Sequence, residues 1–162
     1  MYQVGDIVVH PMHGSGKIKA VVTQRNCGRE QDYYVFSIPT GGLELFIPVE
    51  SAEAIGVRNL IGVEQANVLM HSFSIVSNER CTNWSKRYRD NLERLKSGDL
   101  NQVVEVLKTL LLRDYQQGLS TGERKMLYMA KQIFITEIAV VIDDEYEAVE
   151  KAICQSVRAA IK

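Results

Sequence analysis

The side chains best suited to chemistry lie together at Thr82–Arg89, around the single tryptophan of the sequence. Trp84 is followed by Lys86, Arg87 and Arg89, so three cations lie within five residues of an aromatic ring. Cations bind phosphate, and an aromatic ring can stack on an unpaired base or wedge into the minor groove. One interpretation of this spacing is a nucleic-acid site, and the pattern alone does not decide it. The alternative is a core residue, because a tryptophan at the end of an apolar stripe is more often buried.

A helix would position this tryptophan. Thr82 and Asn83 precede it as capping residues, and Ser97-Gly98 is a typical helix end. We therefore expect Trp84 in the first turn of a helix. At 100° per residue, the apolar face of that helix would contain Trp84, Tyr88, Leu92 and Leu95.

Composition excludes several classes of protein. The chain has 162 residues and is 46% hydrophobic, enough for one domain or two small ones. We find no apolar run of the ~20 residues that a membrane span needs and no signal peptide, so we expect a cytoplasmic protein. Three cysteines (Cys27, Cys81 and Cys154) are widely spaced, which indicates free thiols and neither a disulfide framework nor a zinc site.

Charge is unevenly distributed along the chain, although the formal net charge is only -1. Residues 80–96 contain six basic side chains against two acidic ones, whereas residues 132–150 contain six acidic and no basic side chains. A DNA contact would therefore be local to the first of these segments and would not involve the C-terminus.

The first fifty residues have the pattern of a small sheet. Strands are predicted over residues 6–10, 17–22, 33–38 and 43–47, with turns rich in Pro and Gly at 11–16, 25–28 and 39–42. Short strands at this spacing predict a strongly bent sheet or open barrel of the SH3/Tudor kind. Modules of this kind usually bind partners.

The rest of the chain has helical periodicity. After one helical turn at 51–56, we expect a helix over 63–70, a connecting loop over 72–81, and the Trp84 helix. Asp99 would cap the next helix, Ser120 with Glu123 forms a capping box for the following one, and the last would cover 145–161. The predicted fold is α+β: a Tudor/SH3-like β module (residues 1–58) and an all-helical domain of four to five helices (residues 59–162).

The common catalytic motifs are missing from the sequence. It contains no P-loop, GxGxxG, HExxH or GxSxG. His10 and His13 have no carboxylate or cysteine cluster nearby, so we assign no metal, cofactor or catalytic residue. A third and weaker hypothesis is an enzyme dependent on Cys81, whose basic neighbours would lower the pKa of its thiol.

Four motifs together resemble the CarD/CdnL family of bacterial RNA-polymerase-binding transcription regulators. They are Val4–Gly14, Pro48–Ala52 with Gly56–Arg58, Thr82–Tyr88, and Gly118–Leu127. The first motif also occurs in transcription-repair coupling factors, and its combination with the Trp84 motif is specific.

The resemblance implies a function for each part. The β module would bind the β subunit of bacterial RNA polymerase, and the helical domain would set Trp84 at the upstream edge of the transcription bubble. Promoter DNA would be bound without sequence specificity by Asn83, Trp84, Lys86, Arg87 and Arg89, which favours the open complex. The free protein would be a monomer.

The polymerase-binding residues of similar proteins align less well with this chain. Two positions at which relatives carry arginines fall at Gln24 and Phe46. Arg25 could substitute for the first charge. An exposed Phe46, with Leu45 and Ile47 beside it, could supply an apolar contact by strand addition or edge packing, or it could belong to the core. The second functional hypothesis is an adaptor in which Trp84 is core and the helical domain docks another protein without contacting DNA.

Overall fold

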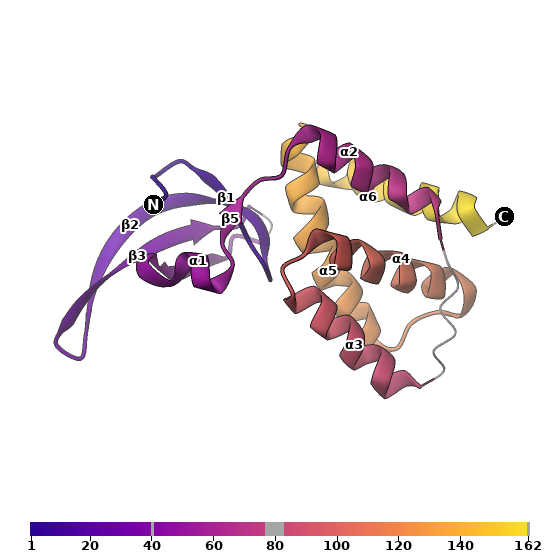
Figure 1. The fold of residues 1–162 in the computed structure, drawn as a ribbon, viewed down its shortest axis with the longest axis horizontal. Helices are drawn as coiled ribbons and strands as arrows, with labels where there is room; N and C mark the ends of the chain where they lie inside the picture. The colour runs from indigo at the N-terminus through magenta and orange to yellow at the C-terminus, as the bar shows by residue number, and fades with distance from the viewer. Residues whose placement is uncertain (40, 77–82, 162) are drawn as a thin grey trace.

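The computed structural model describes residues 1–39, 41–76 and 83–161. Its N-terminal part is a sheet of five antiparallel strands in the order β4-β3-β2-β1-β5, drawn at the left of Figure 1. The strands are β1 (Ile7–His10), β2 (Gly14–Asn26), β3 (Arg29–Ser37), β4 (Glu44–Pro48) and β5 (Arg58–Asn59). The order leaves β4 and β5 as the edge strands.

The β2–β3 hairpin is longer than the sequence predicts and projects from the sheet (Figure 1). Cys27 and Gly28 form its turn, with φ of 52° and 80°, while Asn26 and Arg29 already pair across the strands. Two successive residues with positive φ match the twist of the flanking strands, so pairing continues to the turn. The prediction of a turn over residues 25–28 was therefore wrong for Arg25 and Asn26, which belong to β2.

A short helical segment covers one face of the sheet. It consists of η1 (Val49–Ser51) and α1 (Ala52–Ile55), and Gly56 ends α1 in the left-handed region with φ of 105°. Apolar side chains from the strands and from this segment form the core of the module: Val8, Ile18, Tyr34, Phe36, Ile38, Ile47, Ala52 and Val57. The predicted helical turn and β module are confirmed.

The C-terminal part is helical, as predicted. It contains α2 (Val63–His71), η2 (Ser72–Ser74), α3 (Trp84–Lys96), α4 (Leu100–Gln117), α5 (Thr121–Val141) and α6 (Tyr146–Ile161). Side-chain oxygens of Asn83, Asp99 and Ser120 cap α3, α4 and α5 by accepting backbone N–H groups. All three caps agree with the sequence prediction. In the described part of the chain, no helix is both long and apolar enough to cross a membrane.

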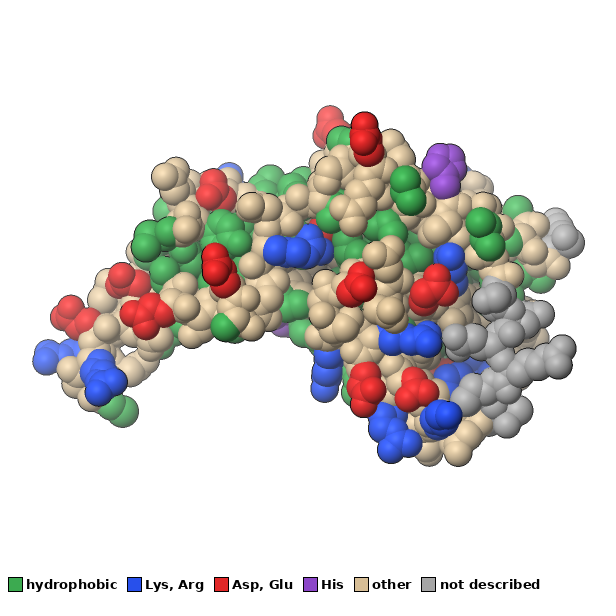
Figure 2. Space-filling model, viewed as in Figure 1, with side chains coloured by type: hydrophobic (Ala, Val, Ile, Leu, Met, Phe, Trp, Pro, Cys, Tyr) green, Lys and Arg blue, Asp and Glu red, His purple; other side chains and the backbone are tan. Residues whose placement is uncertain are grey.

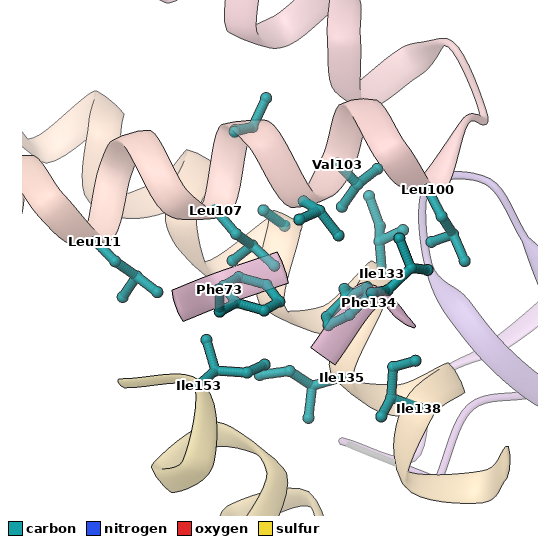
Figure 3. Packing of buried hydrophobic residues seen from close by; sticks show 14 of the residues in the cluster. Phe73, Leu100, Val103, Leu107, Leu111, Ile133, Phe134, Ile135, Ile138 and Ile153 are labelled. Atoms are coloured by element: carbon teal, nitrogen blue, oxygen red, sulfur yellow. The ribbon is translucent and has the colours of Figure 1, made fainter. Parts of the chain in front are cut away.

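The helical core is built around two phenylalanines. Phe73 and Phe134 are both fully buried, with ring centroids 5.5 Å apart, and pack among aliphatic side chains of α4, α5 and α6 (Figure 3). The prediction of a loop over 72–81 was wrong at its start, because η2 carries Phe73 into this core. A segment of three residues is too short to show helical periodicity. Residues 77–82, which include Cys81, lie outside the described residues.

Candidate nucleic-acid interface

Trp84 lies at the first helical position of α3 and is half-exposed. Its ring stacks on Tyr88, with centroids 5.2 Å apart and an interplanar angle of 21°, and 46% of the residue remains accessible. The indole Nε1–H donates to the Ser120 hydroxyl at 3.2 Å. The interpretation of Trp84 as a buried core residue was therefore wrong. The ring is fixed on its inner side and open on its outer side.

The first turn of α5 packs against this ring. A Cβ atom added at Gly122 would lie 3.3 Å from Cε2 of Tyr88 and 3.7 Å from Cζ2 of Trp84. The stacked aromatic pair thus rests on the backbone of α5, and glycine is the residue that allows this close approach. The N-termini of α3 and α5 consequently meet beside Trp84.

A buried ion pair lies behind the aromatic pair. Arg87 and Glu123 are 5% and 3% exposed, and Nε of Arg87 lies 3.3 Å from Oε2 of Glu123. Arg113 approaches the same oxygen at 3.6 Å, and the Ser120 hydroxyl donates to the other at 3.2 Å. Burial raises the pKa of the Glu123 carboxyl, but Arg87, Ser120 and Arg113 outweigh burial, so the pKa lies below its usual value.

This geometry corrects the prediction for Arg87. Its guanidinium is enclosed against Glu123 and is not available to a phosphate in this structure. The error came from the face assignment: Arg87 lies three residues after Trp84, on the buried side of α3 with Asn91 and Leu95. Asn83 also has a structural task, since its Oδ1 accepts the Lys86 N–H at 3.2 Å.

Four exposed cations lie on the two helices whose first turns meet at the aromatic pair. Lys86 and Arg89 lie on α3, as the sequence predicts. Arg124 and Lys125, in the first turn of α5, were missed. The signal that could have found them is the pair of cations directly after the capping box, but only the fold shows that this turn lies against Trp84. Figure 2 shows Lys and Arg side chains gathered over α3, with acidic side chains between them.

Two helix N-termini and the exposed cations Lys86, Arg89 and Lys125 make this surface suitable for phosphate, whereas Arg124 lines a pocket with Asp114 and Glu145. The first turn of a helix offers backbone N–H groups and the positive end of the helix dipole. Acidic side chains of α3, Asp90 and Glu93, are exposed beside the cations, so the positive field is confined to the neighbourhood of Trp84. The surface can hold a phosphate backbone next to a flat aromatic ring.

The predicted polymerase-binding residues separate into exposed and buried ones. Gln24 and Arg25 are exposed near the end of the β2–β3 hairpin, and Phe46 on the edge strand β4 is 52% exposed. Ile47 is 3% exposed within the module core, and Leu45 is half-buried against it. The prediction of Ile47 as a contact residue was therefore wrong, because adjacent residues of a strand point to opposite faces.

The two histidines lie half-buried at the end of β1 and in the turn that follows it. Nδ1 of His10 accepts the Met12 N–H at 3.1 Å, and its ring lies 4.8 Å from that of His13. Burial, with a smaller contribution from His13, lowers the pKa of His10 to about 4. Within the described ranges, no group of three or more His, Cys, Asp or Glu residues is placed to hold a metal ion.

Known proteins resemble both halves of the chain. Residues 2–61 match the CarD-like/TRCF RID domain, and residues 68–154 match the CarD C-terminal domain. A protein of Bacillus subtilis (strain 168) named "Putative transcription factor YdeB" is 29% identical over 141 residues, which cover 87% of this chain and 92% of that protein. The chain thus belongs to the CarD family of transcription-associated, RNA polymerase-interacting regulators.

Proposed function

We propose that this protein binds the β subunit of bacterial RNA polymerase through its β module and stabilises the open promoter complex through Trp84. Trp84 is placed at the upstream edge of the transcription bubble, and Lys86, Arg89 and Lys125 hold the backbone phosphates. The half-exposed ring between two helix N-termini is the observation that carries the proposal. The protein acts as a monomer.

The open complex gains stability because the ring binds one state of the DNA better than the other. A stack on an unpaired base is worth about 1–3 kcal/mol. A ligand shifts an equilibrium by its difference in affinity for the two states, so this energy corresponds to roughly a 5- to 150-fold shift. No proton or group transfer is required. Tyr88 and Gly122 hold the ring from behind, so that DNA binding does not have to order it first.

The DNA half of the proposal is tested by the lifetime of open complexes formed by polymerase on one promoter. Trp84→Ala is expected to remove most of the lengthening that the wild-type protein produces, and Trp84→Phe to retain part of it. Tyr128→Ala is the matched control, because Tyr128 is also on the surface, 61% exposed, but lines a pocket with Arg124 and Tyr146 rather than the surface around Trp84. A Trp84→Ala variant that acts like wild type would refute the wedge and favour a protein-docking adaptor.

The phosphate contacts are tested separately, by the dependence of the effect on promoter sequence and on salt. Lys86→Ala and Arg89→Ala should each weaken the effect to the same degree on promoters of different sequence, and each should reduce the salt slope by about 1. Arg87→Ala should instead lower the stability of the protein, because Arg87 is buried with Glu123. A loss that depends strongly on promoter sequence would contradict backbone binding.

The proposed contact with polymerase is the exposed edge of β4. Among the described strands, β4 pairs only with β3, so its outer edge offers N–H and C=O groups for strand addition, and Phe46 lies exposed along it. Phe46→Ala should weaken capture of the protein by an isolated β-subunit lobe and leave folding intact. Ile47→Ala, one residue away in the core, should lower thermal stability. Equal binding by Phe46→Ala and wild type would exclude this edge as the contact.

A further inference from the structure

We infer that α5 fixes the distance and angle between the two binding surfaces, and that the contacts of Gly14, Ser15 and Arg58 with α5 are positioning contacts on which open-complex stabilisation depends. The inference rests on the function proposed above. It goes further by assigning a role to the junction between the sheet and the helices, which touches neither polymerase nor DNA in that proposal. In Figure 1, α5 lies on the side of the helical domain that faces the sheet.

The N-terminal end of α5 holds Trp84. Ser120 caps the helix and accepts the indole N–H, and Gly122 supports the stacked rings. Glu123, one residue on, is paired with Arg87 of α3. The position of the ring is thus set by the first turn of α5 and not by α3 alone.

The other half of α5 holds the β module at Thr136. The Ser15 hydroxyl donates to the Thr136 carbonyl at 2.8 Å, and the Ser15 N–H donates to the Thr136 hydroxyl at 3.1 Å. Gly14, with φ of +81°, packs so closely that an added Cβ would overlap the Thr136 hydroxyl and the Gln132 carbonyl. Ser15 and Thr136 are both buried, so the contact between β2 and α5 excludes water.

An ion pair closes the junction next to these hydrogen bonds. Arg58 of β5 lies 2.8 Å from Glu137 of α5, whose side chain is completely buried. A second contact of the same pair is 2.9 Å long. A buried carboxylate that lost this partner would be strongly destabilised, so the pair restricts the junction to one arrangement. Residues 60–62, which connect β5 to α2, are the covalent link beside it.

One helix therefore carries both attachments. From Ser120 to Thr136 the helix rises roughly 24 Å, at about 1.5 Å per residue. A chain with two binding surfaces gains affinity from the second contact only when its geometry allows both contacts at once, and this gain reaches about 10²- to 10⁴-fold. If the junction is loosened, each surface keeps its own affinity while their joint action is lost.

Gly14→Ala perturbs the junction without touching either binding surface. The matched control is Gly5→Ala, because Gly5 also has a positive φ, +97°, but an added Cβ there meets nothing within 4 Å. Both substitutions carry the strain of a left-handed alanine, and only the first wedges the sheet away from α5. Glu137→Gln disturbs the same junction by a different route, since it leaves the Arg58 charge without its partner.

The distance between the modules is measured in the free protein by energy transfer from Trp84 to an acceptor on the exposed Cys27, with Cys81 and Cys154 replaced by serine. We expect the distance distribution to be broader in Gly14→Ala and Glu137→Gln, and unchanged in Gly5→Ala. The unlabelled variants are then compared for binding to the polymerase β lobe and for open-complex lifetime. Junction variants should bind the lobe within about twofold of wild type yet lose most of the roughly 5- to 150-fold effect on the open complex.

An unchanged distance distribution in both junction variants would overturn the inference. A broader distribution with the lifetime effect retained would overturn it as well. A junction variant that no longer binds the lobe counts against it too, because the junction would then be needed to fold the module. The proposed function fails on a different result, a Trp84→Ala variant that lengthens the open complex as wild type does.

Discussion

Replacing Glu123 by glutamine should destabilise the protein more than any other exchange of a single charge beside Trp84. The substitution keeps the shape of the side chain but removes the carboxylate charge that lies 3.3 Å from the buried Arg87 guanidinium. Breaking a buried pair in this way costs about 3–5 kcal/mol. The lower end applies because the nitrogen–oxygen distances are 3.3 and 3.6 Å and Arg113 is 28% exposed, so it can turn to water.

Urea unfolding measures this cost directly. With a slope of about 2 kcal/mol per molar, a loss of about 3 kcal/mol lowers the urea midpoint by about 1.5 M. The double variant Arg87→Met with Glu123→Gln should recover part of this loss, because it removes the buried charge as well. A midpoint shift below about 0.3 M, or a double variant as unstable as the sum of the single ones, would refute the reasoning.

The difference in unfolding free energy between wild type and Glu123→Gln should become smaller at low pH. Because the folded pKa of Glu123 is lowered, its stabilising contribution is complete above the unfolded value, about 4.3, and is lost as the pH falls through the folded pKa. The gap between wild type and Glu123→Gln should therefore narrow below about pH 4. A gap that stayed constant down to pH 2 would show that the carboxylate charge is not its source.

Three further predictions concern single side chains. Iodide should quench Trp84, which is 46% exposed, to an intermediate degree, and Ser120→Ala should increase the quenching; complete protection would contradict the exposed edge. Phe73→Ala should cost about 3–5 kcal/mol in urea unfolding because Phe73 is fully buried against Phe134, and a loss under 1 kcal/mol would mean that η2 is not part of the core. The His10 ring should titrate near pH 4 by NMR, because burial lowers its pKa in the folded protein. The free energy of unfolding should therefore fall as the pH drops from about 6.5 to 4, and His10→Gln should reduce this dependence on pH. Titration of the ring near pH 6.5 would rule this out.

Local signals in the sequence predict much of the fold. The caps at Asn83, Asp99 and Ser120 each depend on one side chain and the backbone beside it, and all three are present in the structure. The strands of the β module and the helix-ending Gly56 are local in the same way. Boundaries were less accurate where pairing across strands decides them, as at the end of β2, since the partner strand is not visible in a local pattern.

The candidate site is harder to predict because its contacts join distant parts of the chain. Trp84 and its first-turn position follow from residues 82–98, but Arg87 meets Glu123 and Trp84 meets Ser120 over 36 residues. Apolar periodicity does not distinguish a buried arginine with a counter-ion from an exposed one. For the same reason, the cations of α5 were read as part of a motif and not as neighbours of the tryptophan.

The Ser120 hydroxyl links the N-terminus of α5 to the Trp84 indole. It accepts the Glu123 N–H and the Trp84 indole N–H and donates to the Glu123 carboxylate, which uses its full capacity of two acceptor positions and one donor. The same hydroxyl thus caps α5 and fixes the orientation of the tryptophan. A peptide with the α3 sequence has the same ring and cations but none of this support, so it should be inert. Under the proposed function, a chain in which α5 has not folded lacks this support for Trp84 and should not stabilise the open complex.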